Sequence, residues 1–243
     1  VAMTGARASL QAQGTLSHNL ANSDTPGFKE ALANTEAFPI RGPGFASRVD
    51  ALHVDAGFNR TAGAQHITGK PLDLSLQTGT WLAVQSTDGS EAYTRGAALS
   101  VTPNGQLVTS SGRPVLDDNN NPIAIPPYQA MEIGNDGTIS IIPQGEGPQT
   151  MAMIGRIKVV QAPDDRLERG LDGLFRNTDP LQPFAQAQGT AVHSGQLEGS
   201  NVDAAGALVQ MIQLQRQYEM QVQVIKHGDD NARSANSLLR LGS

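Results

Sequence analysis

The side chains that most often bind metals or transfer protons are scattered along this sequence. It has five histidines, which match neither H-E-x-x-H nor another metal-ligand spacing. The histidines are His18, His53, His66, His193 and His227. The chain has no cysteine, which excludes disulfides, thiolate metal sites and a cysteine nucleophile. We therefore expect no metal site.

The acidic residues do not form a catalytic pattern either. The run from Asp117 to Asn121 offers hard oxygen ligands, but it lacks EF-hand spacing and a closing glutamate, and it is better interpreted as a solvated hairpin tip. The pairs Asp164-Asp165 and Asp229-Asp230 are sequence neighbours whose side chains diverge on a strand or a helix. No nucleophile elbow, P-loop or G-x-G-x-x-G motif is present. The sequence predicts no catalytic residue, no cofactor and no enzymatic activity.

The composition indicates a chain rich in short strands, with a small core. Aromatic residues make up 4% of its 243 residues, and Trp81 is the only tryptophan, whereas a large enzyme usually buries many aromatic side chains. The 26 glycines and 14 prolines predict frequent turns. This composition excludes an all-helical protein.

The formal charge of −6 is mild, and the chain has no run of Lys or Arg. It therefore lacks the basic patch that binds a phosphate backbone or an anionic membrane, so we expect no nucleic-acid partner and no stable membrane insertion. No apolar stretch reaches the roughly 20 residues of a membrane span, and the start lacks the pattern of a Sec signal. Because the first residue is Val1 rather than Met, we expect that residues preceding it are missing.

A short helix is expected at the amino terminus. Six residues recur at spacings of three and four, as in a heptad seam: Met3, Ala6, Leu10, Gln13, Ser17 and Leu20. Gly5 and Gly14 each destabilise such a helix by roughly 1 kcal/mol relative to Ala, so it should need a partner that covers its stripe. The helix should end before Pro26, and Pro26-Gly27 is typical of a type II turn with a positive φ at Gly27.

The middle of the chain predicts a linker followed by a β-rich domain. Residues 29–70 show no periodic pattern and are expected to form an extended linker. Residues 71–195 alternate short β-branched and aromatic runs with turn dipeptides, which predicts short hairpins. The strongest hairpin signals are Asp88-Gly89, Asn104-Gly105 and Asp136-Gly137. The run from Ile154 to Gln161 predicts a further strand.

The last part of the chain, residues 196–243, predicts a long helix without proline. Ten residues recur at spacings of three and four: Leu208, Met211, Gln215, Tyr218, Val222, Ile225, Asp229, Ala232, Asn236 and Leu239. Polar members such as Gln215, Asp229 and Asn236 lower the stability of a seam while fixing its register. We expect a helix cap at Ser200 or Asn201.

These elements define an α+β protein with four parts: a first helix and turn (1–28), a linker (29–70), a β-rich domain (71–195) and a last helix (196–243). The two helices either pair within the monomer, as apolar stripes usually do, or pack against neighbouring subunits of a polymer. The glycines of the first helix favour the polymer. We therefore expect the terminal helices to pair in a coiled-coil-like layer that forms on assembly.

Two motifs at opposite ends of the chain resemble the signatures of one protein family. The first runs from Asn19 to Lys29 and reads NLANSDTPGFK. The second runs from Leu197 to Val202, reads LEGSNV, and is followed by Met211 and Tyr218 in the long seam. Both resemble, in order and in position, the terminal signatures of the flagellar axial proteins, which are the rod and hook subunits. The resemblance extends over essentially the whole chain.

This resemblance implies a structural subunit of the bacterial flagellar basal body. Such a subunit is exported unfolded by the flagellar type III apparatus and is assembled in the periplasm. The family's terminal segments fold on assembly, so the helices would line a rod that transmits torque and forms part of the export channel. The residues expected at the assembly interface are Met3, Ala6, Leu10, Asn19, Leu20, Asn22, Thr25, Pro26, Gly27, Phe28, Leu208, Met211, Ile212, Gln215, Tyr218, Val222, Ile225, Ala232, Asn236 and Leu239.

Within the family, the middle of the chain resembles the proximal rod subunits. The similar segments are Pro71–Leu74, Trp81–Gln85, Asp88–Arg95 and Arg169–Arg176. The distal rod protein FlgG usually has a longer linker. The expected partners are the other proximal rod proteins, FlgG, further copies of this chain and, in transit, the export apparatus. The alternatives are FlgG itself, a secreted domain that binds or cleaves peptidoglycan, and a secreted β-rich adhesin.

Overall fold

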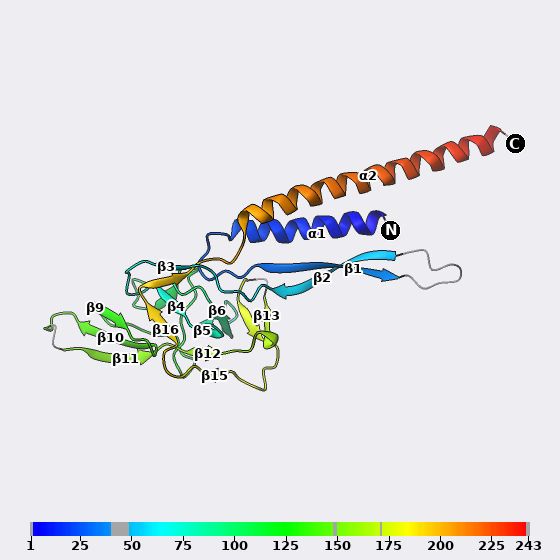
Figure 1. Ribbon diagram of the computed structural model, residues 1–243. Coiled ribbons are helices and arrows are strands. Elements are labelled where there is room, and N and C mark those ends of the chain that lie inside the picture. Colours follow the sequence, from blue (N-terminus) through cyan, green and yellow to red (C-terminus); the bar gives the residue numbers. More distant parts are fainter. Residues whose placement is uncertain (1, 40–48, 148–149, 171, 242–243) are drawn as a thin grey trace. The chain divides into compact units, whose positions relative to one another are not determined.

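The structure is a computed structural model that describes residues 2–39, 49–147, 150–170 and 172–241 (Figure 1). The chain divides into two compact units. The terminal unit comprises Val1–Ser23, Glu30–Asn59 and Val202–Ser243, and the β unit comprises Asp24–Lys29 and Arg60–Asn201. Helices occur together with many short strands, which confirms the α+β class. Neither helix, as far as it is described, has the length and apolarity of a membrane span.

The terminal unit contains two antiparallel helices of unequal length, α1 (Ala2–Ala21) and α2 (Ala204–Leu241) (Figure 1). With 20 residues α1 extends about 30 Å, and with 38 residues α2 extends about 57 Å. Ser9 donates a hydrogen bond from Oγ to Gln221 Oε1 at 3.5 Å. This hydrogen bond joins the first half of α1 to the middle of α2.

Small residues allow α1 to approach its neighbours closely. Ala6, Ala8 and Ser9 are buried. A Cβ added to Gly5 would lie 2.9 Å from Gln221 Nε2, so this glycine lies where α2 comes closest. A residue expected only to weaken the helix therefore also permits its packing. The expected cap at Ser200 or Asn201 is wrong, because α2 begins directly after Asp203, whose carbonyl oxygen accepts the N–H of Ala207 at 2.9 Å.

A β-hairpin lies where the sequence predicts an extended linker. Its strands are β1 (Ala31–Pro39) and β2 (Val49–Phe58), which pair antiparallel. Asn19 of α1 holds the start of β1, because its side-chain amide donates to Ala31 O and accepts from Ala31 N, both at 2.9 Å. Alanine-rich segments have low β propensity, so this hairpin lacks the usual strand signal. The two hydrogen bonds from the Asn19 side chain partly compensate for the low β propensity at the start of β1.

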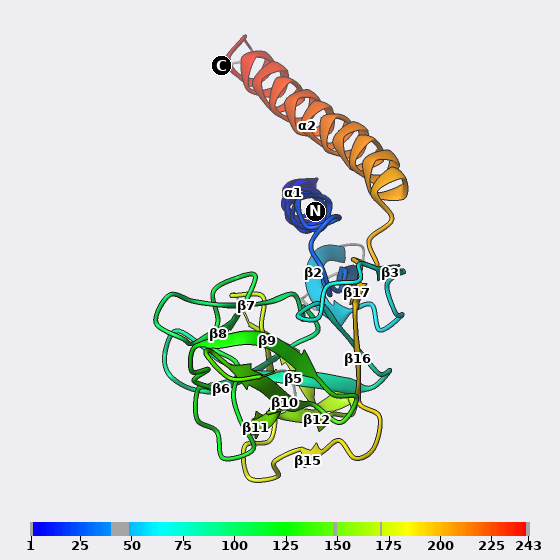
Figure 2. The ribbon, with the colours of Figure 1, turned by 90° about the vertical axis from the view of Figure 1, so that its left-hand side faces the viewer.

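The β unit is built from short antiparallel strands. Its strands are β3 (Gln65–Ile67), β4 (Leu74–Leu76), β5 (Thr80–Gln85), β6 (Glu91–Thr94), β7 (Leu99–Val101), β8 (Leu107–Thr109), β9 (Tyr128–Ile133), β10 (Thr138–Pro143), β11 (Ala152–Arg156), β12 (Val159–Gln161), β13 (Leu167–Arg169), β14 (Phe175–Asn177), β15 (Ala185–Gln186), β16 (Val192–Ser194) and β17 (Gln196–Glu198). A 3₁₀ turn, η1 (Asp164–Arg166), precedes β13. The largest sheet has the order β13-β14-β6-β5-β12-β15. A three-stranded sheet has the order β11-β10-β9, and Figure 2 shows these three strands together. Three strand pairs complete the unit: β16-β4, β17-β3 and β7-β8.

The three predicted hairpins are confirmed. Asp88-Gly89 connects β5 to β6, Asn104-Gly105 connects β7 to β8, and Asp136-Gly137 connects β9 to β10. The three glycines have φ between +77° and +86°, the left-handed region that such turns require. The local turn chemistry therefore defines these connections.

The single strand expected over Ile154 to Gln161 is divided between two sheets. β11 pairs with β10, whereas β12 pairs with β5. The chain changes partners at Ile157 and Lys158, whose N–H groups donate to Gly137 O and Leu116 O, each at 2.9 Å. Backbone partners far away in sequence therefore interrupt a continuous apolar run.

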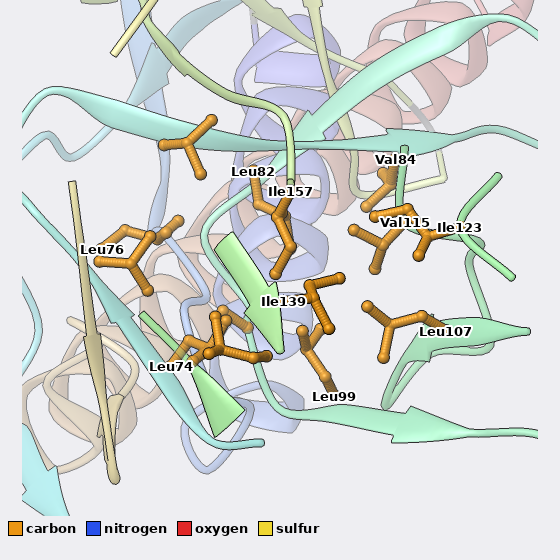
Figure 3. Close-up of a cluster of buried hydrophobic side chains, with 14 of the residues drawn as sticks. Leu74, Leu76, Leu82, Val84, Leu99, Leu107, Val115, Ile123, Ile139 and Ile157 are labelled. Atoms are coloured by element: carbon orange, nitrogen blue, oxygen red, sulfur yellow. The ribbon is translucent and has the colours of Figure 1, made fainter. Parts of the chain in front are cut away.

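One aliphatic cluster connects the sheets of the β unit (Figure 3). Leu82 and Val84 of β5 meet Leu107 of β8, Ile139 of β10 and Ile157, and all are at most 1% exposed. The few aromatic residues pack nearby, with the rings of Trp81 and Phe175 4.6 Å apart. The core is mainly aliphatic, in agreement with the low aromatic content.

Candidate assembly site

The two signature motifs meet in the β unit. Gly27 donates its N–H to Glu198 O at 2.7 Å, and Asn201 donates its N–H to Phe28 O at 3.3 Å. The expected turn is confirmed, since Phe28 N donates to Thr25 O at 3.2 Å and Gly27 has φ +69°. A Cβ on Gly27 would lie 2.2 Å from the carbonyl carbon of Arg95, so no larger residue fits without a shift of the backbone.

A buried ion cluster lies behind this contact. We call Lys29, Arg95 and Glu198 the ion clasp. Glu198 Oε1 accepts from Lys29 Nζ at 2.8 Å and from Gly63 N at 3.0 Å. Its Oε2 accepts from Arg95 Nε at 2.8 Å and also from Arg95 Nη2. The carboxylate side chain is 0% exposed, yet both of its oxygens are saturated with donors.

The two cations of the ion clasp also bind backbone carbonyls. Lys29 Nζ donates to Thr61 O at 2.7 Å. Arg95 donates to the carbonyls of Gln77 and Thr80 from Nη1, at 3.0 and 2.6 Å, and to Leu76 O from Nη2 at 2.9 Å. The clasp therefore joins β17, the end of β6, the turn before β5 and both motifs.

The ionised form of Glu198 is favoured inside the protein. Burial alone would raise the pKa of its carboxyl group, but the charge of Arg95 and the hydrogen bonds from Lys29 and Gly63 hold the pKa below its ordinary value. A buried carboxylate with this many donors serves as a structural anchor. The described residues contain no group of three or more His, Asp or Glu placed to hold a metal ion.

An aromatic contact covers the first motif. The guanidinium of Arg169 lies 4.4 Å from the centre of the Phe28 ring, and its Nη1 donates to Lys29 O at 3.1 Å. Phe28 is buried at 8% exposure. This motif residue, expected at the assembly interface, lies in the interior of the β unit.

The chain crosses between the two units four times, and residues near each crossing are hydrogen-bonded either to the ion clasp or to a carbonyl that the clasp binds. The β unit holds Asp24–Lys29 and Arg60–Asn201, so the chain crosses at both ends of each segment. Thr61 O accepts from Lys29 Nζ and, at 2.9 Å, from Asn201 Nδ2. Lys29, Thr61 and Asn201 lie beside three of the crossings and are therefore connected through the carbonyl oxygen of Thr61. The segment after the remaining crossing, which begins at Asp24, is bound through Gly27 N.

In α2, the stripe that faces α1 differs from the expected seam. Its least exposed described residues recur at helical spacing: Ala207, Met211, Leu214, Tyr218, Gln221 and Val222. Met211, Tyr218 and Val222 also belong to the expected seam, whereas Leu208 is 48% exposed and Gln215 is exposed. Ala232 is exposed, and the side chains of Asn236 and Leu239 lie outside the described residues.

A second apolar row lies on the opposite side of α2. It consists of Leu208, Val209, Ile212, Met220 and Val224, which are 48–60% exposed. From Gln223 to Ser234 every described residue is exposed, and Ile225 is 37% exposed. Helical spacing alone could not separate the row that faces α1 from this outer row.

The expected interface residues of α1 also divide between two environments. Met3 and Leu10 are 63% and 49% exposed, whereas Ala6 is buried and Leu20 is half-buried. Asn19 is buried against β1, and Asn22 Nδ2 donates to His18 O at 2.8 Å.

The three residues of the ion clasp are not among those that the sequence predicted for the assembly interface. Lys29 and Glu198 stand inside the two motifs, and Arg95 ends the run that begins at Asp88. The sequence feature that could have indicated this ion pair is a cation in one motif, Lys29, and an anion in the other, Glu198.

The comparisons with known proteins agree with this geometry. Three family models match separate parts of the chain: "Flagella basal body rod protein" residues 1–29, "Flagellar hook protein FlgE/F/G D1 domain" residues 76–141, and "Flagellar basal body rod FlgEFG protein C-terminal" residues 193–238. The first and last matches contain the two motifs of the clasp. The fold and the site thus define a structural protein of the flagellar axis.

Relatives that match nearly the whole chain show to which rod proteins it is similar. The chain is 42% identical to the flagellar basal-body rod protein FlgF of Escherichia coli (strain K12), over 99% of this chain and 97% of the relative. It is 40% identical to FlgF of Salmonella typhimurium with the same coverage. A FlgG from Buchnera aphidicola is 30% identical over 98% of both chains.

The chain therefore belongs to the FlgF family of flagellar basal-body rod proteins. It is a structural subunit of the periplasmic rod of the basal body and not an enzyme. The alternative of a peptidoglycan-cleaving domain is wrong. FlgG is the lower-identity alternative.

Proposed function

We propose that this chain polymerises through its terminal helices, with the outer row of α2 as the main contact surface. The observation that carries the proposal is the presence of two apolar rows on opposite sides of α2. One row faces α1, and the other exposes Leu208, Val209, Ile212, Met220 and Val224. Exposed apolar surface of this extent on a helix is typical of a protein contact site.

The energetics favour burial of this row in a packed assembly. Complete burial of one such side chain contributes about 1.5–3 kcal/mol. Several side chains buried together are needed to offset the rigid-body entropy lost on association. The exposed side chains of this row lie between Leu208 and Val224, so one face of α2 offers a continuous stretch of contact surface.

We further propose that the ion clasp stiffens the points where the chain enters and leaves the β unit, through which torque passes. Near all four crossings, residues are hydrogen-bonded to Glu198 either directly or through Lys29. Buried, directional ion pairs resist displacement, because partial separation leaves charges without solvation. This arrangement supports a role for the ion clasp in keeping these points of the β unit rigid while the rod rotates.

A position in the proximal rod is supported by the higher identity to FlgF than to FlgG. We also propose a place along the export channel, as the resemblance to the rod and hook subunits implies. Neighbouring proximal rod proteins, FlgG and further copies of this chain are the proposed partners, and the type III apparatus is the partner in transit. A chain without cysteine suits passage in an unfolded state.

The test places a charge on the outer row. Ile212→Asp and Val224→Asp are compared with Gln210→Asp, a matched exposed position that lies three, four or seven residues from no member of the row. Burial of an unpaired carboxylate costs several kcal/mol, so we expect about tenfold or greater loss of the two variants from isolated basal bodies, with loss of motility. Gln210→Asp should assemble normally.

Fluorescence of Trp81 during urea unfolding provides the folding control, since this buried residue lies in the β unit. All three variants should unfold like the unmodified chain. Normal incorporation and swimming of both row variants would show that α2 does not form the contact proposed.

A further inference from the structure

The most exposed large apolar side chain of the described residues is Leu181, at 91%. It lies in the loop between β14 and β15, between Pro180 and Pro183. We call Asp179–Gln182 the Leu181 knob. A leucine with this exposure adds nothing to the core of its own chain.

Hydrogen bonds hold the Leu181 knob in one conformation. Asp179 accepts from Leu181 N through Oδ1 at 3.1 Å and from Gln182 N through its carbonyl oxygen at 3.2 Å. Gln182 O in turn accepts from Asn177 Nδ2 at 2.8 Å and from Arg166 Nη2. A side chain presented on an ordered loop loses little further entropy when it binds, which is the property of a contact anchor.

A hollow of about 480 Å³ opens elsewhere on the β unit, over the outer face of β9 and β10. We call it the β9–β10 groove. Its floor includes Ala130 and Ile142, which are paired, and Glu132 and Ser140, which are also paired and therefore point to the same side. Met151, at 57% exposure, lies at its edge.

Hydrogen bonds connect the residues of the opposite wall of the groove. Pro71 lines it, and Ser194 Oγ donates to Pro71 O at 2.9 Å. Thr68 N and Gly69 N both donate to Gly195 O, at 2.9 and 3.0 Å. A firm wall facing a flexible methionine can accommodate an apolar side chain from a partner.

The knob and the groove lie at opposite sides of the β unit. Thr178, at the base of the knob, donates its N–H to Arg166 O at 2.9 Å, directly before β13. Figure 1 shows β13 on the side of this unit opposite to β9, β10 and β11. The knob therefore cannot reach the groove of its own chain. We propose that the Leu181 knob of one copy docks in the β9–β10 groove of the next copy.

Charges of opposite sign accompany the two surfaces. Asp179 lies two residues before Leu181, and Lys70 lies between the groove residues Gly69 and Pro71. Arg166 at the base of the knob and Glu132 in the groove form a second complementary combination. Exposed pairs of this kind orient two surfaces, while the leucine supplies the anchor.

A contact between different patches on identical chains is heterologous. It continues from copy to copy and builds a helical row instead of closing a dimer. The inference rests on the proposed function, in which copies of this chain are neighbours in the rod. It adds a contact between β units to the contact between helices.

The absence of cysteine allows a direct test. Leu181→Cys and Ser140→Cys are combined in one full-length chain, expressed in cells that lack the unmodified copy, and basal bodies are isolated and oxidised. We expect disulfide-linked dimers and longer ladders. A strain that expresses the two single variants together should give dimers that join Leu181→Cys to Ser140→Cys, identified by peptide mass spectrometry.

Two controls separate the possible causes. In Asn119→Cys with Ser140→Cys, the first cysteine lies on another exposed turn, and we expect cross-linking about tenfold lower. Leu181→Asp in the Ser140→Cys background should unfold at the same urea concentration as the parent, because residue 181 contacts no core. Its incorporation into basal bodies should fall.

The outcomes are distinct. If the subunit is present in basal bodies but the double variant forms no ladder, the docking is wrong while polymerisation through α2 stands. Cross-links to a different rod protein, or equal cross-linking by the Asn119→Cys control, would also overturn docking between copies. Loss of incorporation by the Ile212→Asp and Val224→Asp variants tests the helix contact separately.

Discussion

Replacement of Glu198 by alanine tests the ion clasp most directly. The substitution removes the only anion among Lys29, Arg95 and Glu198, and these cations are 4% and 5% exposed. Both cations keep their backbone carbonyl partners, but neither keeps a counter-charge. Truncation of one member of a buried ion pair costs about 3–5 kcal/mol, because the remaining charge is desolvated without compensation.

Glu198→Gln separates charge from shape. The amide retains one acceptor oxygen, but its NH₂ group must face either Lys29 and Gly63 or Arg95, all of which are donors. The glutamine variant should therefore lose a large part of the same free energy. Glu219→Ala, an exposed position on α2, is the matched control and should change stability by about 0.5 kcal/mol or less.

Urea unfolding followed by Trp81 fluorescence measures this effect in the β unit. Trp81 is 2% exposed, and Arg95 of the clasp lies 5.8 Å from its ring centre. With a denaturant slope of about 2 kcal/mol per M, a loss of about 3–5 kcal/mol lowers the midpoint by about 1.5–2.5 M.

The pH dependence provides a second readout. Because the pKa of Glu198 is lower in the folded protein than its ordinary value of 4.5, its contribution to stability is fully present above pH 4.5 and is lost as the pH falls through the folded pKa. The difference between the unmodified chain and Glu198→Ala should therefore shrink in acid. A Glu198→Ala variant that unfolds like the Glu219→Ala control at neutral pH would refute the anchoring role.

Three further predictions concern other parts of the chain. Gly27→Ala should destabilise the β unit in urea unfolding by well over 1 kcal/mol, since its Cβ would meet backbone at 2.2 Å. Gly89→Ala has open space around its Cβ and should lose only about 1 kcal/mol from backbone strain. Similar losses in both variants would contradict the steric argument. Asn19→Ala removes both hydrogen bonds to Ala31, so amide exchange in β1 should accelerate about tenfold, which unchanged protection would contradict. Hydrogen bonds from Arg176 lower the pKa of Asp172 to about 2, so Asp172→Asn should reduce stability at neutral pH and the reduction should vanish as the pH falls from 3.8 toward 2 in acid titrations.

Local chemistry made several features predictable. Asp88-Gly89, Asn104-Gly105 and Asp136-Gly137 define their own turns, because Gly alone readily adopts the required positive φ. The turn at Pro26-Gly27 follows the same logic. Both helices were predicted from spacing, and the two motifs indicated the family.

Features that depend on distant partners were not predictable. The hairpin of β1 and β2 has weak strand propensity and is paired at its start by Asn19 of α1. The apolar run near Ile157 divides between two sheets, because the carbonyl oxygens of Gly137 and Leu116 accept its backbone N–H groups. In α2, Leu208 and Met211 fit one seam equally well, but only Met211 belongs to the stripe that faces α1.

The class of protein, the two helices and the predicted hairpin turns were visible in the sequence, since they depend on residues close together in the chain. What the two terminal motifs do depends on contacts that form only in the folded chain. Lys29 and Arg95 lie 169 and 103 residues from Glu198, and their charges interact because the folded chain buries all three in one place. Burial removes the water that would otherwise screen these charges, so the three side chains together hold distant segments of the β unit in place.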